Sequence, residues 1–170
     1  MIKAIVYTSN TGYTKEYAGL LGNRLSLPVY SVKEAPKQLK KKEEILYLGW
    51  LFAANVKGYQ KAAKRYTVRA VCGVGLGDTG AQINEVRKAT DLPEGLPLFT
   101  IQGGMDHDKL KGINRFMIKM LTKMLDSKAD RTEDESRMLE LIKKGGNYVS
   151  EQNLNDVLAW YDAYTKNKEN

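Results

Sequence analysis

The sequence predicts an α/β protein, built on an open and mostly parallel sheet that helices cover. Short apolar runs rich in strand-forming residues alternate with segments whose apolar residues recur at helical spacing. The chain has 170 residues, of which 42% are apolar and 28% charged, so it is long enough to form a hydrophobic core. We therefore expect one globular domain spanning residues 1–170.

The first half of the chain contains four of the expected strands. Residues 2–8 (IKAIVYT) are a compact apolar run that ends in a polar turn, and a helix should follow because Tyr17, Leu21 and Leu25 share one face. Beyond it we expect a short strand at residues 28–32, and then a basic loop or surface helix at 33–42. A third strand should follow at 44–49, a helix rich in Lys and Ala at 57–66, and a fourth strand at 68–76.

The second half is expected to be mainly helical. A weak helix at residues 81–89 precedes the fifth strand at 96–101, which ends in a glycine-rich exit or tight turn at 102–104 (QGG). A long helix should span residues 108–125, and we interpret the methionines of its apolar stripe as core filler. Thr132 and Glu135 should form a capping box at the start of the next helix, and Gly145 with Gly146 should end it. A last helix should follow around residues 154–161.

Composition excludes several classes of function. The only cysteine, Cys72, excludes a disulfide framework, and the only histidine, His107, excludes a multi-histidine metal site. No stretch approaches the ~20 apolar residues of a membrane span, and we recognise no signal peptide. We expect a cytoplasmic protein, with Cys72 buried in a strand and His107 solvated in a loop. The net charge of +7 permits an anionic partner, but no nucleic-acid-binding motif accompanies it.

The turn after the first strand is the first candidate site. Residues 8–14 (TSNTGYT) place Thr and Ser hydroxyls, an asparagine and a glycine between a strand and a helix amino terminus. That position offers unpaired backbone N–H groups and the positive end of the helix dipole. The turn has no Lys or Arg and no G-x-G-x-x-G pattern, so it is neither a Walker A loop nor a dinucleotide turn. Such residues are also ordinary helix caps, but the place after an amino-terminal strand favours a phosphate monoester site.

Two further segments follow strands that should end beside this turn. Residues 50–55 (WLFAAN) bring a tryptophan and a phenylalanine, which either pack in the core or form a wall for a flat aromatic ligand. Residues 74–78 (VGLGD) contain two glycines at which the backbone can approach a ligand, while Asp78 or Thr79 can equally cap the next helix. In an open parallel sheet, ligands bind beyond the carboxyl ends of the strands, where the strand order reverses.

These motifs resemble those of flavodoxins. The run IKAIVYT followed by TSNTGYT is similar to the flavodoxin phosphate loop T/S-x-T-G-x-T, and GLGD after the fourth strand looks similar too. With residues 102–104, the segment 114–124 (NRFMIKMLTKM) resembles the flavodoxin-like branch that includes menaquinone-dependent protoporphyrinogen dehydrogenase. The resemblance implies a doubly wound, five-stranded parallel sheet in the order 2-1-3-4-5, with helices on both faces and extra carboxyl-terminal helices.

The resemblance also implies a noncovalently bound FMN. Its phosphate would sit on the first turn, at Thr8, Ser9, Asn10, Thr11, Gly12, Tyr13 and Thr14. Its isoalloxazine would lie against Trp50, Leu51, Phe52, Ala53, Ala54 and Asn55, and against Val74, Gly75, Leu76, Gly77 and Asp78. Flavodoxins have a glycine peptide near the flavin N5 that can flip. Here we expect Asn55 in that place, because Asn tolerates a positive φ.

Two functions remain open. The first is an FMN-dependent oxidoreductase that passes electrons from a reduced organic substrate, with protoporphyrinogen as one candidate, to a quinone or another acceptor. The second is a small electron carrier that meets a redox partner protein and has no substrate of its own. The basic helix favours the first, and the absence of a large substrate-binding insertion favours the second. A third interpretation is an interaction domain that binds no nucleotide.

The helix at residues 108–125 carries a separate prediction. Lys111, Arg115, Lys119 and Lys123 recur every four residues, on a different face from its methionines. Such a helix either covers the sheet with its basic face in solvent or contacts an anionic membrane peripherally, on the inner face.

Overall fold

The computed structural model describes residues 1–110 and 112–169 and has the predicted α/β architecture. Five parallel strands form the main sheet in the order β2-β1-β3-β5-β6, which is the expected 2-1-3-4-5 when these strands are counted along the chain. Their bounds are β1 Ala4–Thr8, β2 Val29–Ser31, β3 Glu44–Phe52, β5 Thr67–Gly75 and β6 Leu98–Gln102. This is the strand order of the flavodoxin-like fold.

The strand order reverses between β1 and β3. Ile5 of β1 lies opposite Val29 of β2 on one side and opposite Leu46 of β3 on the other. The chain therefore leaves β1 toward one edge of the sheet and returns to build the other half from β3. Loops that follow β1 and β3 diverge at this point, which leaves a crevice at the carboxyl edge of the sheet.

One face of the sheet is covered by the first and last helices of the chain. α1 (Tyr13–Leu25) and α7 (Asn155–Glu169) pack on a cluster that includes Ile5, Leu46 and Val157. The helical spacing of the apolar residues in α1, recognised in the sequence, places Tyr17 and Leu21 in this core.

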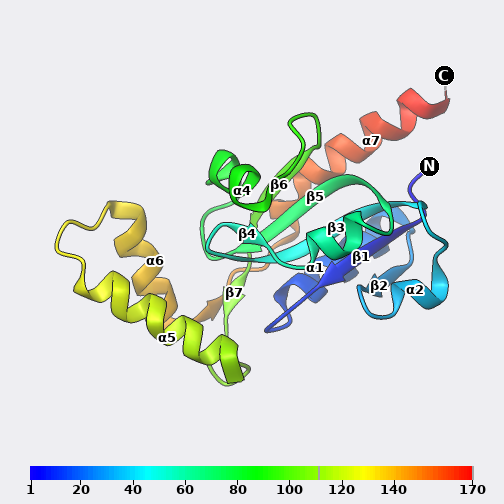
Figure 1. Cartoon of the computed structure of the whole chain (residues 1–170). Coiled ribbons are helices and arrows are strands. Elements are labelled where there is room, and N and C mark those ends of the chain that lie inside the picture. Colours follow the sequence, from blue (N-terminus) through cyan, green and yellow to red (C-terminus); the bar gives the residue numbers. More distant parts are fainter. Residues whose placement is uncertain (111, 170) are drawn as a thin grey trace.

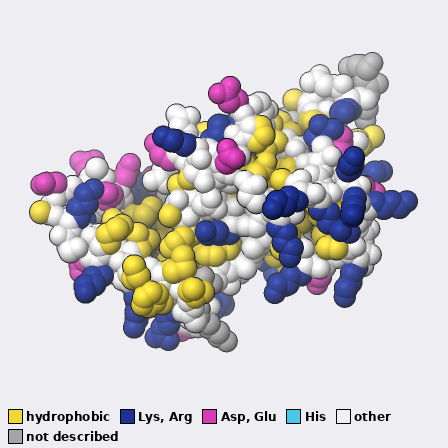
Figure 2. All heavy atoms as spheres, viewed as in Figure 1, with side chains coloured by type: hydrophobic (Ala, Val, Ile, Leu, Met, Phe, Trp, Pro, Cys, Tyr) yellow, Lys and Arg dark blue, Asp and Glu magenta, His cyan; other side chains and the backbone are white. Residues whose placement is uncertain are grey.

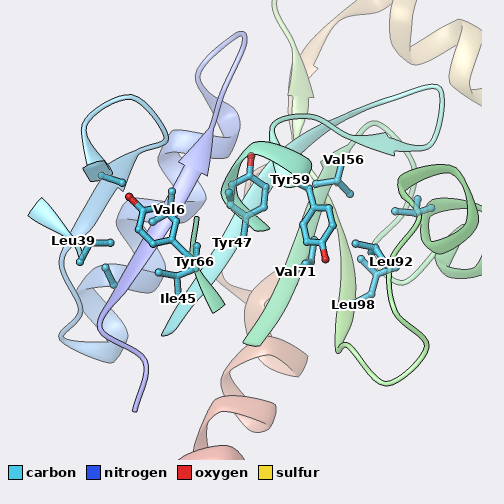
Figure 3. Packing of buried hydrophobic residues seen from close by; sticks show 14 residues of the cluster. Val6, Leu39, Ile45, Tyr47, Val56, Tyr59, Tyr66, Val71, Leu92 and Leu98 are labelled. Carbon is cyan, nitrogen blue, oxygen red and sulfur yellow. The ribbon is translucent and has the colours of Figure 1, made fainter. Parts of the chain in front are cut away.

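The opposite face carries three shorter helices. These are α2 (Ala35–Gln38), α3 (Tyr59–Ala63) and α4 (Ile83–Thr90). Alternate residues of the strands point to this side, and Figure 3 shows Tyr47 and Val71 among them in the second apolar cluster. Both faces of the parallel sheet are thus buried, as the near-continuous apolar strands indicate.

The long helix expected at residues 108–125 does not cover the sheet. α5 (Gly112–Ser127) and α6 (Glu133–Lys144) pack on each other and project from the sheet on a two-stranded ribbon, β7 (Gly104–Met105) with β8 (Gly146–Asn147) (Figure 1). Residues 104–147 are termed the arm. The glycine-rich exit after β6 is therefore the start of a ribbon, and the interpretation as a tight turn is wrong.

The arm has a small apolar core of its own. Its buried side chains are Met105, Leu110, Leu125, Leu139 and Ile142. Met120 and Met124 of the predicted stripe are exposed, so the interpretation as core filler is wrong for these two. The apolar stripe of α5 is wider than the side of α5 that packs against α6. The capping box of Thr132 and Glu135 is confirmed, and α6 ends at Gly145 as expected.

Hydrogen bonds fix the base of the arm to the sheet. The Tyr17 hydroxyl of α1 donates to the carbonyl oxygen of Gln102 at the end of β6. It also accepts from the side-chain amide of Asn153, in the short helix η1 (Glu151–Leu154), over 2.7 Å. This buried phenol joins α1, β6 and the segment that follows the arm, so the arm leaves the sheet from a defined position.

Candidate functional site

A cleft of about 330 Å³ lies at the carboxyl edge of the sheet, where the strand order reverses. This volume is within the range of small-molecule sites. On the sheet side, the cleft is lined by the turn after β1, by the ends of β3, β5 and β6, and by the start of α4. The lining residues on this side are Asn10, Thr11, Tyr13, Thr14, Trp50, Leu51, Phe52, Ala53, Ala54, Val74, Gly75, Leu76, Gly77, Asp78, Ala81, Gln82, Glu85, Thr100 and Ile101.

The turn between β1 and α1 forms the polar end of the cleft. Gly12 is the N-cap of α1 with a φ of 108°, a conformation that residues with a Cβ rarely adopt. It has no side-chain oxygen, so it gives no side-chain cap to the first-turn N–H groups of α1. Ser9 Oγ accepts from the Gly12 N–H at 3.2 Å and closes the turn. Together with the hydroxyls of Thr11 and Thr14, these backbone groups supply neutral donors for an anion.

A buried hydrogen-bonded group supports this turn. The Tyr47 hydroxyl donates to the carbonyl oxygen of Lys57 at 2.7 Å and is hydrogen-bonded to Thr8 Oγ1 at 2.8 Å. Gly58 lies against both, because a Cβ there would be 2.3 Å from Thr8 Oγ1 and from the Tyr47 hydroxyl oxygen. Burial raises the pKa of the Tyr47 phenol, which keeps it protonated. Thr8 therefore fixes the end of β1 and does not line the cleft.

The end of β3 forms an apolar wall. The strand continues to Phe52, so the segment expected as a loop belongs partly to the sheet. The rings of Trp50 and Phe52 are half-buried, and their centroids lie 6.1 Å apart. Leu51 points to the other side of the strand, where Gly73 leaves room for it. A Cβ on Gly73 would lie 2.9 Å from Leu51 Cδ2. The wall thus offers two aromatic rings to a flat ligand.

The turn that ends this wall is strained. Ala53 and Ala54 have φ angles of 48° and 59° and form a two-residue hairpin turn between β3 and β4 (Asn55–Val56). Left-handed backbone costs about 1–2 kcal/mol for a residue with a Cβ, and such strain gathers at functional sites. The prediction of a positive φ at Asn55 is wrong. The hairpin register places Asn55 in β4, where its amide donates to the Ala89 carbonyl oxygen at 2.8 Å.

The arm closes the other side of the cleft. It contributes an almost wholly apolar lining, made of Gly104, Met105, Leu110, Ile118, Leu121, Met138 and Ile142. An ion pair of 2.7 Å between Arg137 of α6 and Asp78 ties the arm to the loop after β5. The arm lies between β6 and α7 and reaches the cleft, which the sequence analysis did not anticipate.

Tyr13 stands where the turn and the arm meet. Its ring lies against the ribbon, because a Cβ on Gly104 would be 2.8 Å from it. Burial and the Asp106 carboxylate raise the pKa of the Tyr13 phenol, while the nearby Lys109 ammonium opposes them. The phenol is therefore neutral at pH 7 and offers an O–H donor to the cleft.

Most of the predicted site residues meet in this one cleft, with four exceptions. Thr8, Ser9 and Gly12 shape the turn from outside the lining, and Asn55 faces α4. His107, expected as a solvated loop residue, lies outside the cleft on a groove along α5. As cleft lining, sequence reasoning missed the start of α4, Thr100 and Ile101 of β6, and the residues of the arm. The glycine-rich exit after β6 was the one signal that the chain leaves the sheet there.

Comparisons with protein-family models, with curated proteins and with solved structures gave no match. Within residues 1–110 and 112–169, no helix is both long and apolar enough to cross a membrane. The fold and the cleft alone therefore define the class of protein. The chain is an α/β protein with the flavodoxin-like strand order and a switch-point cleft that is polar at one end and apolar elsewhere.

Proposed function

We propose that the chain binds FMN noncovalently and is an oxidoreductase that passes electrons from a reduced organic substrate to a quinone or another acceptor. One observation carries the proposal: an uncharged donor turn and a half-buried aromatic wall share a single cleft. FMN combines an anionic phosphate ester with a flat ring system, so it needs both surfaces. Neither surface alone would favour a flavin over other ligands.

Different residues would hold the two ends of the cofactor. Thr11, Thr14 and the first-turn N–H groups of α1 would hold the phosphate, with Ser9 fixing the turn behind them. Trp50 and Phe52 would flank the isoalloxazine, which supplies electron or hydride transfer when it is bound. The protein binds and orients the ring and limits the access of water. The described cleft residues need supply no general acid or base for simple electron transfer.

The arm favours an enzyme over the alternative, an electron carrier that meets a redox partner protein. A carrier needs only an exposed edge of its ligand. Here Leu110, Ile118 and Leu121 add an apolar surface opposite the aromatic wall, which gives an organic substrate a place to bind. The chemistry of this lining suits a flat apolar molecule, and protoporphyrinogen remains a candidate from the resemblance alone. We propose a cytoplasmic location, where a free thiol such as that of Cys72 stays reduced.

FMN binding is tested by titration, with the absorbance or fluorescence of the flavin as the readout. The wild type should bind FMN at least tenfold more tightly than riboflavin, because only FMN presents a phosphate to the turn. Thr11→Asp should abolish most of that difference by repulsion, while leaving riboflavin affinity nearly unchanged. Thr11→Asn is the matched neutral control and should keep the preference. A folded wild type that takes up neither flavin would overturn the proposal.

A turnover assay separates the enzyme from the carrier. FMN-loaded protein should oxidise protoporphyrinogen, or another reduced organic compound, when a water-soluble quinone is the acceptor. Substitution of Leu121 by Asp should lower this rate while FMN affinity changes little, because Leu121 belongs to the arm wall. No turnover, combined with rapid reduction by a flavodoxin reductase, would assign the carrier function.

A further inference from the structure

The exposed apolar side chains of this protein gather on one helix. Ile113, Phe116, Met120 and Met124 of α5 are 73%, 61%, 58% and 60% exposed. Apart from Met1, they are the large apolar residues that the described part of the chain leaves exposed. Their spacing of three or four residues places them on one side of the helix, and Figure 2 shows hydrophobic side chains gathered over α5. A contiguous patch of this kind marks an interaction surface.

A row of positive charge runs beside this apolar face. Arg115, Lys119 and Lys123 are exposed and follow one another at intervals of four residues, whereas Lys111 lies outside the described residues. The one acid of α5, Asp126, forms an ion pair of 2.8 Å with Lys143. An open groove of about 540 Å³ lies along this side, lined by His107, Ile118, Lys119, Thr122, Lys123, Asp126 and Ser127.

The apolar face is not needed to hold the arm together. A third side of α5, with Ile118, Leu121 and Leu125, faces α6 and the cleft. The helix therefore has a packed side, an exposed apolar side and a basic side, at successive angles around its axis. This arrangement matches helices that lie in a membrane interface, with apolar residues among acyl chains and cations at the level of the headgroups.

We propose that α5 docks this protein on an anionic lipid surface, with Phe116 and Met120 at the centre of the contact and Arg115, Lys119 and Lys123 on the phosphates. A second copy of the chain fits the same face less well in an antiparallel two-fold contact between α5 helices, because that contact would bring the two basic rows together. The whole chain, with a net charge of +7, is attracted to the same surface. The proposal does not depend on a bound flavin.

Docking in this orientation brings the cleft close to the lipid. Met117 is half-buried and lies four residues from both Ile113 on the exposed side and Leu121 in the cleft lining. The apolar surface is thus continuous around α5 from the exposed face to the cleft. One helix diameter, about 10 Å, separates the two sides. A ligand dissolved in the membrane would have only this distance to cross.

The test is co-sedimentation with vesicles of phosphatidylcholine alone or mixed with phosphatidylglycerol. The wild type should bind the anionic vesicles at least tenfold better, and binding should weaken as salt rises. Phe116→Ser with Met120→Ser should lower anionic-vesicle binding about tenfold or more. Replacing Arg115, Lys119 and Lys123 by Gln should lower it about 100-fold. The control replaces Lys37, Lys40 and Lys41 by Gln, which removes the same charge elsewhere and should have a much smaller effect.

A second measurement does not rely on apolar-to-polar variants. Because Cys72 is fully buried, a cysteine placed at Phe116 can be labelled selectively with a polarity-sensitive fluorophore. Brominated acyl chains should quench this label but not the same label at Lys37. No quenching, or equal binding to neutral and anionic vesicles, would overturn the proposal. So would a dimer that Phe116→Ser with Met120→Ser dissociates while vesicle binding is absent, because it would assign the face to a second copy.

Discussion

The sheet and the arm use apolar side chains in opposite ways. In the sheet, residues such as Ile5, Leu46 and Leu48 are fully buried between helices on both faces. In the arm, a small cluster is buried between α5 and α6, while Phe116 and Met120 on the same hairpin face outward. A small cluster resists local opening only weakly, so we expect the arm to open without unfolding of the sheet. The sheet thus holds the cleft on a rigid core, whereas the arm exposes apolar side chains that can contact another surface.

The largest expected effect comes from truncating one leucine in each region. Leu46→Ala should lower the global free energy of unfolding by about 3 kcal/mol, because it leaves a cavity in the sheet core. Leu139→Ala should lower it by about 1 kcal/mol or less, yet should speed amide hydrogen exchange throughout α5 and α6. Urea unfolding and hydrogen exchange measure the two quantities. Equal losses in global stability would mean that sheet and arm form one cooperative unit.

Lowering the pH should destabilise the sheet more than the arm. Burial disfavours the Glu44 carboxylate, but hydrogen bonds from Arg69, Tyr164 and the amino group of Met1 outweigh it and lower its pKa to about 2. Its stabilising effect is complete above the unfolded pKa of about 4.5 and is lost as the pH falls toward 2. Allowing for solvent screening, Glu44→Gln should cost about 1–2 kcal/mol at pH 7.

Urea unfolding at several pH values checks this sign. The difference between wild type and Glu44→Gln should shrink steadily below pH 4.5 and nearly vanish at pH 2. In the arm, Asp126→Asn removes an exposed ion pair and should change the global free energy of unfolding by under ~0.5 kcal/mol at any pH. A Glu44 difference that stays constant with pH would show that its effect comes from packing and not from charge.

Removal of the arm should have a smaller effect on stability. The ribbon strands Gly104–Met105 and Gly146–Asn147 are already paired antiparallel, so an Asn-Gly turn can join Met105 to Gly146. The shortened chain should lose about 1 kcal/mol of stability, mainly by exposing Leu76 and Tyr13. It should keep FMN affinity within about tenfold but lose anionic-vesicle binding. Circular dichroism, flavin titration and co-sedimentation provide the measurements, and an unfolded product would refute the independence of the sheet.

The same contrast explains what the sequence could predict. The strands β1 and β5, expected at 2–8 and 68–76, bury residues on both faces of the sheet, so their apolar runs predict them whatever surrounds them. The α6 cap is also predictable, because Thr132 and Glu135 interact across three residues. For α5, the sequence shows an apolar stripe, but it does not indicate which part of the protein packs against that stripe. A helix on the sheet and a helix in a projecting hairpin share that pattern.

The cleft was predictable where one segment forms it and unpredictable where two segments meet. The turn after β1 is local, and its hydroxyls and Gly12 indicate a ligand site directly. The wall from α5 and α6 depends on the ribbon, whose two-residue strands are too short to give a periodic signal. The turn at Ala53 and Ala54 escaped prediction because its sequence lacks the Asn-Gly or Gly-Gly pair typical of such hairpins.

The smallest effect expected among the sheet variants concerns that turn, where both alanines have left-handed backbone. Ala54→Gly should stabilise the protein by up to about 1 kcal/mol, because glycine accepts a φ of 59° without the Cβ clash. Ala18→Gly, in the middle of α1, is the matched control and should destabilise by about 1 kcal/mol. Thermal unfolding of the two variants should therefore shift in opposite directions. If Ala54→Gly also destabilises, the turn is held by its surroundings with no strain to relieve. If it stabilises but weakens FMN binding, the strain helps to preorganise the cleft wall.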